Sequence, residues 1–151
     1  MRPVNLQVLR TLMALVFVSA GLGTGQGIAQ SIGGLFQLVG GMDTVKKLST
    51  NVLQSATKDP RLAGVLGKMD TSVATPKLAD QFCATLGGGC KAPLTEKQIA
   101  TGSSKLDASQ TDALREHFSS ALNTVSGNSM AKEALAKAIT PKLAGMVGAL
   151  I

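Results

Sequence analysis

The chain has 151 residues, a formal net charge of +6, two cysteines, one histidine, four phenylalanines and neither tryptophan nor tyrosine. The basic excess is mild and forms no lysine or arginine cluster. The few aromatic rings offer little for base stacking, so nucleic-acid binding is a disfavoured function. The lysines are interpreted instead as a solvated face, and no nucleic-acid partner is expected.

Residues 1–29 have the pattern of a cleavable secretory signal peptide. Arg2 and Arg10 provide a positive start, the run "TLMALVFVSAGLGTG" is uncharged and mostly apolar, and small residues favour cleavage after Ala29. The alternative is a membrane anchor, but the run is shorter than the ~20 residues that span a bilayer and is diluted by glycine. We therefore expect an exported protein, periplasmic or secreted, with no stable membrane span after cleavage and a single domain at 30–151.

Glycines, prolines and capping residues divide the remaining chain into short helices, and no stretch has a convincing strand pattern. Asp43 is predicted to cap a first helix that runs to about Thr57 with an apolar stripe at helical spacing. Asp59, followed by proline, is predicted to open a short second helix. Thr75, also followed by proline, is predicted to open a third that runs to about Leu86 and ends at three glycines.

The C-terminal half is predicted to add three more helical pieces. "TEKQIA" is expected to form one or two turns, and Ser109 with Asp112 resembles a capping box at the start of a longer helix. The last helix is expected to run from about Met130 to the end, with a kink at Pro141, because proline lacks an N–H and crowds the preceding turn. The predicted fold class is therefore all-α.

Cys83 and Cys90 are seven residues apart and bracket these three glycines. An exported protein meets an oxidising compartment, so we predict a disulfide that ties the end of one helix to the loop after it. Two separate thiols, one of them buried, are the alternative. Two cysteines without nearby histidines cannot make a four-ligand zinc site, which disfavours a structural metal.

Five stretches follow one another between Leu35 and Gly148: "LFQLVGG", "TKDPRLAGVLGKMD", "LADQFCATLGGGCK", "LDASQTDALREHFSSAL" and "LAKAITPKLAGMV". In this order they resemble five segments of the truncated haemoglobin family, group 1-like members of the globin superfamily. The segments are the opening, the stretch after the second long helix, the break before the haem-facing helix, and the last two helices. The resemblance implies a truncated-globin-like two-over-two helical sandwich, with haem and diatomic-gas (oxygen) binding as the family role.

The resemblance also implies a haem pocket whose usual ligands this sequence lacks. Counting from "GGGCK" places the family's proximal histidine at Thr101, or at Gly102 or Ser103 if one or two residues are gapped, and none of these side chains can ligate haem iron usefully. The family's distal Phe-Tyr pair falls at Val52 and Leu53, and the chain has no tyrosine. Haem is therefore a doubtful cofactor, and its ligation is expected to be atypical or lost.

Other residues could replace the missing ligand. His117 is the single histidine, and we interpret it as a packed or boundary residue of its helix, with haem ligation as the less favoured alternative. Met69, Met130 and Met146 carry thioether sulfur but are interpreted as core residues that fill gaps. Cys83 could ligate iron as a thiolate, unless a disulfide consumes it.

Lys97 and Lys105 flank the missing-ligand segment and are expected in solvent, or at most beside haem propionates. The implied pocket would hold haem or another flat apolar small molecule. Its expected lining is Val52, Leu53, Leu78, Phe82, Thr101, Leu114 and His117.

Two functions stay open on these grounds. The first is an exported truncated-haemoglobin-like protein that binds haem or a small ligand with altered ligation, and the second is a haem-free globin-fold module with a structural or interaction role. An enzyme is the least favoured class, and no catalytic residue is assigned. Ser119 and Ser120 adjoin His117 in the chain, but such neighbours on a helix do not face one another, and a Cys83–His117 dyad would need the fold to bring the two together.

Overall fold

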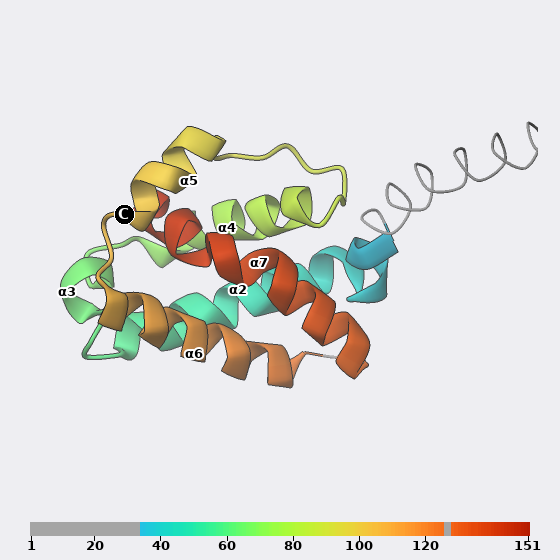
Figure 1. Ribbon diagram of the computed structural model, residues 1–151, viewed down its shortest axis with the longest axis horizontal. Coiled ribbons are helices and arrows are strands. Elements are labelled where there is room, and N and C mark those ends of the chain that lie inside the picture. Colours follow the sequence, from blue (N-terminus) through green and yellow to red (C-terminus); the bar gives the residue numbers. More distant parts are fainter. Residues whose placement is uncertain (1–33, 126–127) are drawn as a thin grey trace, which may run out of the picture. The chain divides into compact units, whose positions relative to one another are not determined.

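The computed structural model describes residues 34–125 and 128–151. After a helical turn at 34–38, these residues form α2 (Gly41–Lys58), α3 (Ala63–Leu66), α4 (Thr71–Thr85), α5 (Glu96–Ser103), α6 (Ala108–Thr124) and α7 (Ser129–Leu150) (Figure 1). No strand occurs in these two ranges, which confirms the predicted all-α class. None of the helices described is long and apolar enough to cross a membrane. The signal peptide predicted at 1–29 lies outside the described residues.

One continuous apolar core joins the four longest helices. α2 packs against α4 and α6, and α7 packs against α4, α5 and α6. Phe82 of α4 meets Phe118 of α6 edge to face, with their ring centroids 6.0 Å apart. Each fully buried leucine or phenylalanine of this core contributes about 1.5–3 kcal/mol relative to an exposed one. The apolar stripe of α2 that enters the core consists of Val45, Leu48, Val52, Leu53 and Ala56.

α2 begins before the residue that was predicted to cap it. Gly40 precedes the helix with a φ of 104°, a left-handed conformation that glycine adopts without a steric penalty. Asp43 is therefore not the cap. It lies in the first turn, where its negative charge interacts favourably with the positive end of the helix dipole.

α6 also begins before its predicted cap, Ser109. The side chain of Asp107 accepts a hydrogen bond from the backbone N–H of Gln110 at 2.8 Å, and the side chain of Gln110 accepts one from the N–H of Asp107 at 3.0 Å. This reciprocal pair satisfies two N–H groups that the helix itself leaves free, so it outcompetes the predicted box of Ser109 and Asp112.

The predicted start of α4 at Thr75-Pro76 is wrong. Asp70 caps the helix by accepting a hydrogen bond from the N–H of Ser72 at 3.0 Å, so α4 begins at Thr71, about one turn before the predicted start, and Ala74 is already buried. Pro76 lies inside α4 on an exposed position, where water can reach the carbonyl that lacks its usual partner.

The end of α4 agrees with the sequence. Gly87 takes a left-handed φ of 76°, its N–H donates to the carbonyl of Ala84, and the N–H of Gly88 donates to the carbonyl of Cys83. This is the pattern of a glycine-terminated helix. Cys83 and Cys90 form a disulfide with a Cα–Cα distance of 5.7 Å, so the predicted tie between the helix end and its loop is confirmed.

The remaining helix boundaries lie close to expectation. The residues after Asp59-Pro60 form turns and only the short α3, and Asp59 accepts hydrogen bonds from the N–H groups of Arg61, Leu62 and Ala63 at its start. α7 starts at Ser129, capped by the Asn128 side chain, and contains Pro141 within its length.

Candidate functional site

Most residues expected to line a haem pocket lie inside the core. Their side chains belong to one buried cluster, and none of them lines the clefts described below. Such packing does not fit a haem held among them. The five residues concerned, each 0% exposed, are Val52, Leu53, Leu78, Phe82 and Leu114.

The positions expected for the missing proximal histidine fall on the last turn of α5. Thr101 and Ser103 are exposed, and the Thr101 hydroxyl donates to the carbonyl of Lys97 at 2.9 Å. Gly102 is buried against α7, and a Cβ built on it would overlap the carbonyl oxygen of Gly145. A side chain therefore cannot occupy position 102 while α5 keeps its place.

Three glycines allow this close approach of α5 to α7. A Cβ at Gly102 would also lie 2.5 Å from the backbone nitrogen of Ala149, and one at Gly148 would overlap the carbonyl of Gly102. A Cβ at Gly145 would meet the carbonyl of Ile99 in the same way. Backbone therefore packs directly on backbone, which only glycine permits.

His117 lies at the edge of the core and its side chain is 22% exposed, whereas Ser119 and Ser120 are exposed. Ser120 comes three residues after His117, so these two lie on neighbouring positions of one face of α6, contrary to expectation. Its Nε2 is 2.7 Å from Oδ2 of Asp59. The guanidinium of Arg61 pairs with Asp59 at 2.9 Å and with Glu116 at 2.7 Å. The four side chains form a polar cluster that joins the turn before α3 to α6.

Hydrogen bonds explain the charge states in this cluster. The side chain of Arg61, then its backbone N–H, then His117 hold the pKa of Asp59 well below its usual value. Arg61 also lowers the pKa of Glu116, and its own pKa is raised by Asp59 and Glu116. The carboxylates are thus kept ionised, and His117 is directed toward Asp59.

The sulfur atoms offer little toward a metal. Met146 is buried and Met69 is partly buried, but Met130 is 78% exposed, so the interpretation of Met130 as a core residue is wrong. Cys83 is in the disulfide, so it offers neither a thiolate nor a dyad with His117. Within residues 34–125 and 128–151, no three or more histidine, cysteine, aspartate or glutamate side chains gather as a metal site.

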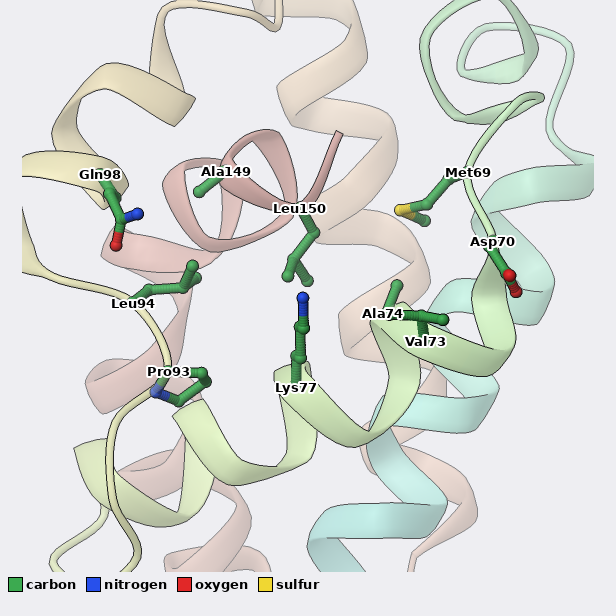
Figure 2. Close-up of a pocket in the computed structure, with 10 residues that line it drawn as sticks. All are labelled: Met69, Asp70, Val73, Ala74, Lys77, Pro93, Leu94, Gln98, Ala149 and Leu150. Carbon is green, nitrogen blue, oxygen red and sulfur yellow. The ribbon is translucent and has the colours of Figure 1, made fainter.

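A cleft of about 350 Å³ lies between α4, the segment before α5, α5 itself and the end of α7 (Figure 2). We call it the α4–α5 cleft. α4 contributes Asp70, Val73, Ala74 and Lys77, which helical spacing places on one face. The other walls are Met69, Pro93, Leu94, Gln98, Ala149 and Leu150.

Several bonds hold the wall of the cleft that precedes α5. Gln81, one turn after Lys77 and only 5% exposed, accepts a hydrogen bond from the N–H of Leu94 at 3.1 Å. Thr95 then caps α5 in a reciprocal box with Gln98, at 2.8 and 3.2 Å. Together with the disulfide, these contacts tether the α4–α5 connection at both of its ends.

The α4–α5 cleft combines apolar side chains with polar groups, among them one cation, Lys77, and one acid, Asp70. Figure 2 shows the Lys77 side chain extending from α4 toward Leu150, and no ion pair of the described residues involves it. Val73 is 51% exposed on the same wall. At the N-terminus of α4, the Ser72 side chain and N–H lower the pKa of Asp70, which keeps this cap ionised.

A second hollow of about 300 Å³ adjoins the cleft along α5. It shares Gln98 and Ala149 with the cleft and is lined further by Lys97, Thr101, Gly102 and Lys105. Thr101 is thus the one expected pocket residue that lines a hollow beside the cleft. The sequence signal for the α4–α5 cleft was a second face of α4, spaced 70, 73, 74 and 77, which carries a lysine and an exposed valine.

Comparison of the chain with protein-family models, with characterised proteins and with solved structures found no match. Whether a haem fits the α4–α5 cleft therefore depends on the donors present there. The lining contains no histidine, and Met69 and Lys77 are the lining side chains most similar to residues that ligate haem iron. This donor set does not fit a histidine-ligated haem.

Proposed function

We propose that the chain is an exported, truncated-globin-like module that works without haem and binds its ligand at the α4–α5 cleft. The observation that carries the proposal is the direct backbone contact of Gly102 with Gly145 and Gly148. It occupies one of the three positions, 101–103, at which the resemblance puts an iron-binding side chain, and the other two, Thr101 and Ser103, are exposed and carry only hydroxyl groups.

The packing of the core supports the same proposal. An apo-globin pocket left empty loses stability in proportion to its volume, at roughly 24 cal/mol per Å³ of cavity. Here Leu53, Phe82 and Leu114 are fully buried among other side chains, which supports a fold whose centre is filled without a cofactor. The cleft between α4 and α5 offers open volume at the surface.

The helix contacts support a truncated-globin-like arrangement of the core. α2 with α4 and α6 with α7 are the two pairs that a two-over-two sandwich requires, and each pair is in contact. Contacts of α2 with α6 and of α4 with α7 would then join the two layers. An experimental structure superposed on a truncated haemoglobin tests this part of the proposal.

A haem titration of the purified protein, for wild type and His117→Ala, tests the haem-free role. We expect no Soret band typical of axial ligation at one haem per chain, and a single cooperative thermal transition without cofactor. A stoichiometric Soret band, or an apo form that becomes rigid only with haem, would overturn the proposal. If the band is lost in His117→Ala, then His117 is the ligand.

Export is proposed from the signal-like pattern at 1–29, and the Cys83–Cys90 disulfide supports it, because such bonds persist in oxidising compartments. Mass spectrometry of the protein from fractionated cells is expected to give a chain that begins after Ala29, in the periplasm or the medium, with the disulfide intact. An uncleaved chain in the cytoplasm with two free thiols would contradict export.

A further inference from the structure

We infer that the α4–α5 cleft binds a single-chain anionic amphiphile, a long-chain carboxylate whose head group pairs with Lys77 and whose alkyl chain lies along the apolar walls. This inference rests on the proposed function in one respect, since it names the ligand class of the site proposed there.

The walls fit an alkyl chain. Met69, Val73, Pro93, Leu94 and Leu150 present apolar side chains from four different segments toward the same space. Val73 remains half exposed although it lies beside this apolar surface. A volume of about 350 Å³ lies at the small end of the range of ligand pockets, roughly 300–1,000 Å³, and suits a narrow flexible molecule better than a broad flat one.

The charges fit a single negative head group. Lys77 extends into the cleft, and it forms no ion pair among the described residues. Lys97 and Lys105 line the adjoining hollow and likewise appear in no ion pair of those residues, so two further cations lie near the cleft. Asp70, the one acid in the lining, is engaged by Ser72 at the opposite end of the α4 face.

The cleft is held open by the protein itself. Glycine contacts hold α5 on α7, while the Gln81–Leu94 hydrogen bond and the disulfide hold the connecting segment on α4. Binding therefore costs little free energy for ordering the site, which favours affinity for a small molecule.

The test uses dodecanoate and dodecanol below their aggregation limits, with calorimetry and amide chemical shifts of the purified protein as readouts. We expect dodecanoate to bind one per chain, and shifts to move at α4, at 91–95 and at the end of α7. Each additional methylene buried, from octanoate to dodecanoate, is expected to strengthen binding by up to about three- to four-fold. Absence of binding by both compounds would overturn the inference.

Two variants separate the head group from the chain. Lys77→Met retains the length of the side chain without the charge, and we expect dodecanoate to bind about five- to ten-fold more weakly while dodecanol stays within about two-fold. Lys77→Arg should restore most of the affinity for dodecanoate. Lys47→Met, an exposed lysine of α2 outside the cleft, is the matched control and should change neither.

Val73→Asp tests the location independently. The new carboxylate lies in the first turn of α4, where it is compatible with the helix, but it faces the cleft one turn from Lys77 and repels the ligand. We expect at least about ten-fold weaker dodecanoate binding in a protein with unchanged thermal unfolding. Binding that none of the cleft variants weakens would place the ligand elsewhere and overturn the inference.

The outcomes also separate this inference from the proposed function. A protein that shows no Soret band and no dodecanoate binding keeps the haem-free role and loses only the ligand class. A protein that binds haem at one per chain, with dodecanoate displacing it, loses the haem-free role.

Discussion

α5 packs closely against α7 on one face and borders an open cleft toward α4 on the other. Toward α7, no side chain of Gly102 or Gly148 intervenes and the two backbones touch. Toward α4, a cleft of about 350 Å³ separates the helices, and the Gln81–Leu94 hydrogen bond and the Cys83–Cys90 disulfide hold the segment before α5 on α4. The close backbone packing at these glycines thus fixes how near α5 lies to α7, and so helps to set the width of the cleft on the other side.

The side chains on the two sides of α5 also differ in their chemistry. The segment at 101–103 presents hydroxyl groups to solvent and a glycine to α7. The opposite wall of the cleft, on α4, carries Val73 and Lys77. The cleft beside α5 thus offers apolar side chains together with one cation and a few polar groups.

Gly102→Val is expected to have the largest effect. Its β-carbon would overlap the Gly145 carbonyl, so α5 must leave α7, and we expect a loss of about 3 kcal/mol or more, or failure to fold. Urea denaturation followed by circular dichroism measures it. Gly64→Ala is the matched control, because nothing lies within 4 Å of its Cβ and the helix gains up to about 1 kcal/mol. Equal stability of Gly102→Val and wild type would contradict the close packing.

Removing the Cys83–Cys90 disulfide tests the first of the two contacts that hold the segment before α5 on α4. The double variant Cys83→Ala/Cys90→Ala is expected to lose about 2–3 kcal/mol, because a cross-link between residues seven apart restricts the unfolded chain. Urea midpoints under oxidising and reducing conditions measure the effect. Reduced wild type should approach the double variant, which itself should not respond to reductant. A wild type insensitive to reductant would show that the bond contributes nothing.

Gln81→Met tests the second tether. The N–H of Leu94 loses its partner, and we expect a loss of about 1 kcal/mol together with weaker dodecanoate binding as the wall loosens. Thermal unfolding and calorimetry provide the two readouts. Gln54→Met, an exposed glutamine of α2, serves as control and should alter neither. A loss of stability without any loss of binding would show that this wall does not shape the cleft.

Acid titration gives the smallest effect and serves as a reference, because the Asp59 cluster touches neither face of α5. The pKa of Asp59 is lower in the folded state than its unfolded value near 4, so its contribution is complete above that pH and is lost as the pH falls below it. Asp59→Asn should therefore show a smaller decrease in urea midpoint between pH 7 and pH 2 than wild type. Asp43→Asn, which removes an exposed acid, should follow wild type. Parallel curves for wild type and Asp59→Asn would contradict the pKa shift.

Much of the fold could be predicted where a few neighbouring residues decide it. Gly87 ends α4 because the following N–H groups can bond back within one turn, and Cys83 reaches Cys90 because only a short loop separates them. The start of α4 could not be read in this way. The Thr75-Pro76 pair predicts a start at the proline, but Asp70 caps the helix earlier, and the burial of Ala74 favours that earlier start.

The candidate site was predictable only in part. The resemblance directed attention to Val52, Leu53 and Phe82, which a helical pattern places inward without revealing whether inward means a pocket or a filled core. The α4–α5 cleft depends on which face of α4 meets the end of α7. Lys77 and Leu150 are too far apart in the chain for periodicity to relate them.

The sequence by itself determined that this protein is helical, where α4 ends and which cysteines pair, because capping, glycine geometry and short-loop closure act between near neighbours. Only the tertiary structure decided that Gly102 lies against Gly145 and Gly148, and that Lys77 extends into an apolar cleft. The physical reason is that close backbone approach and a shared cleft are properties of pairs of helices, and packing of the whole core selects which pairs meet.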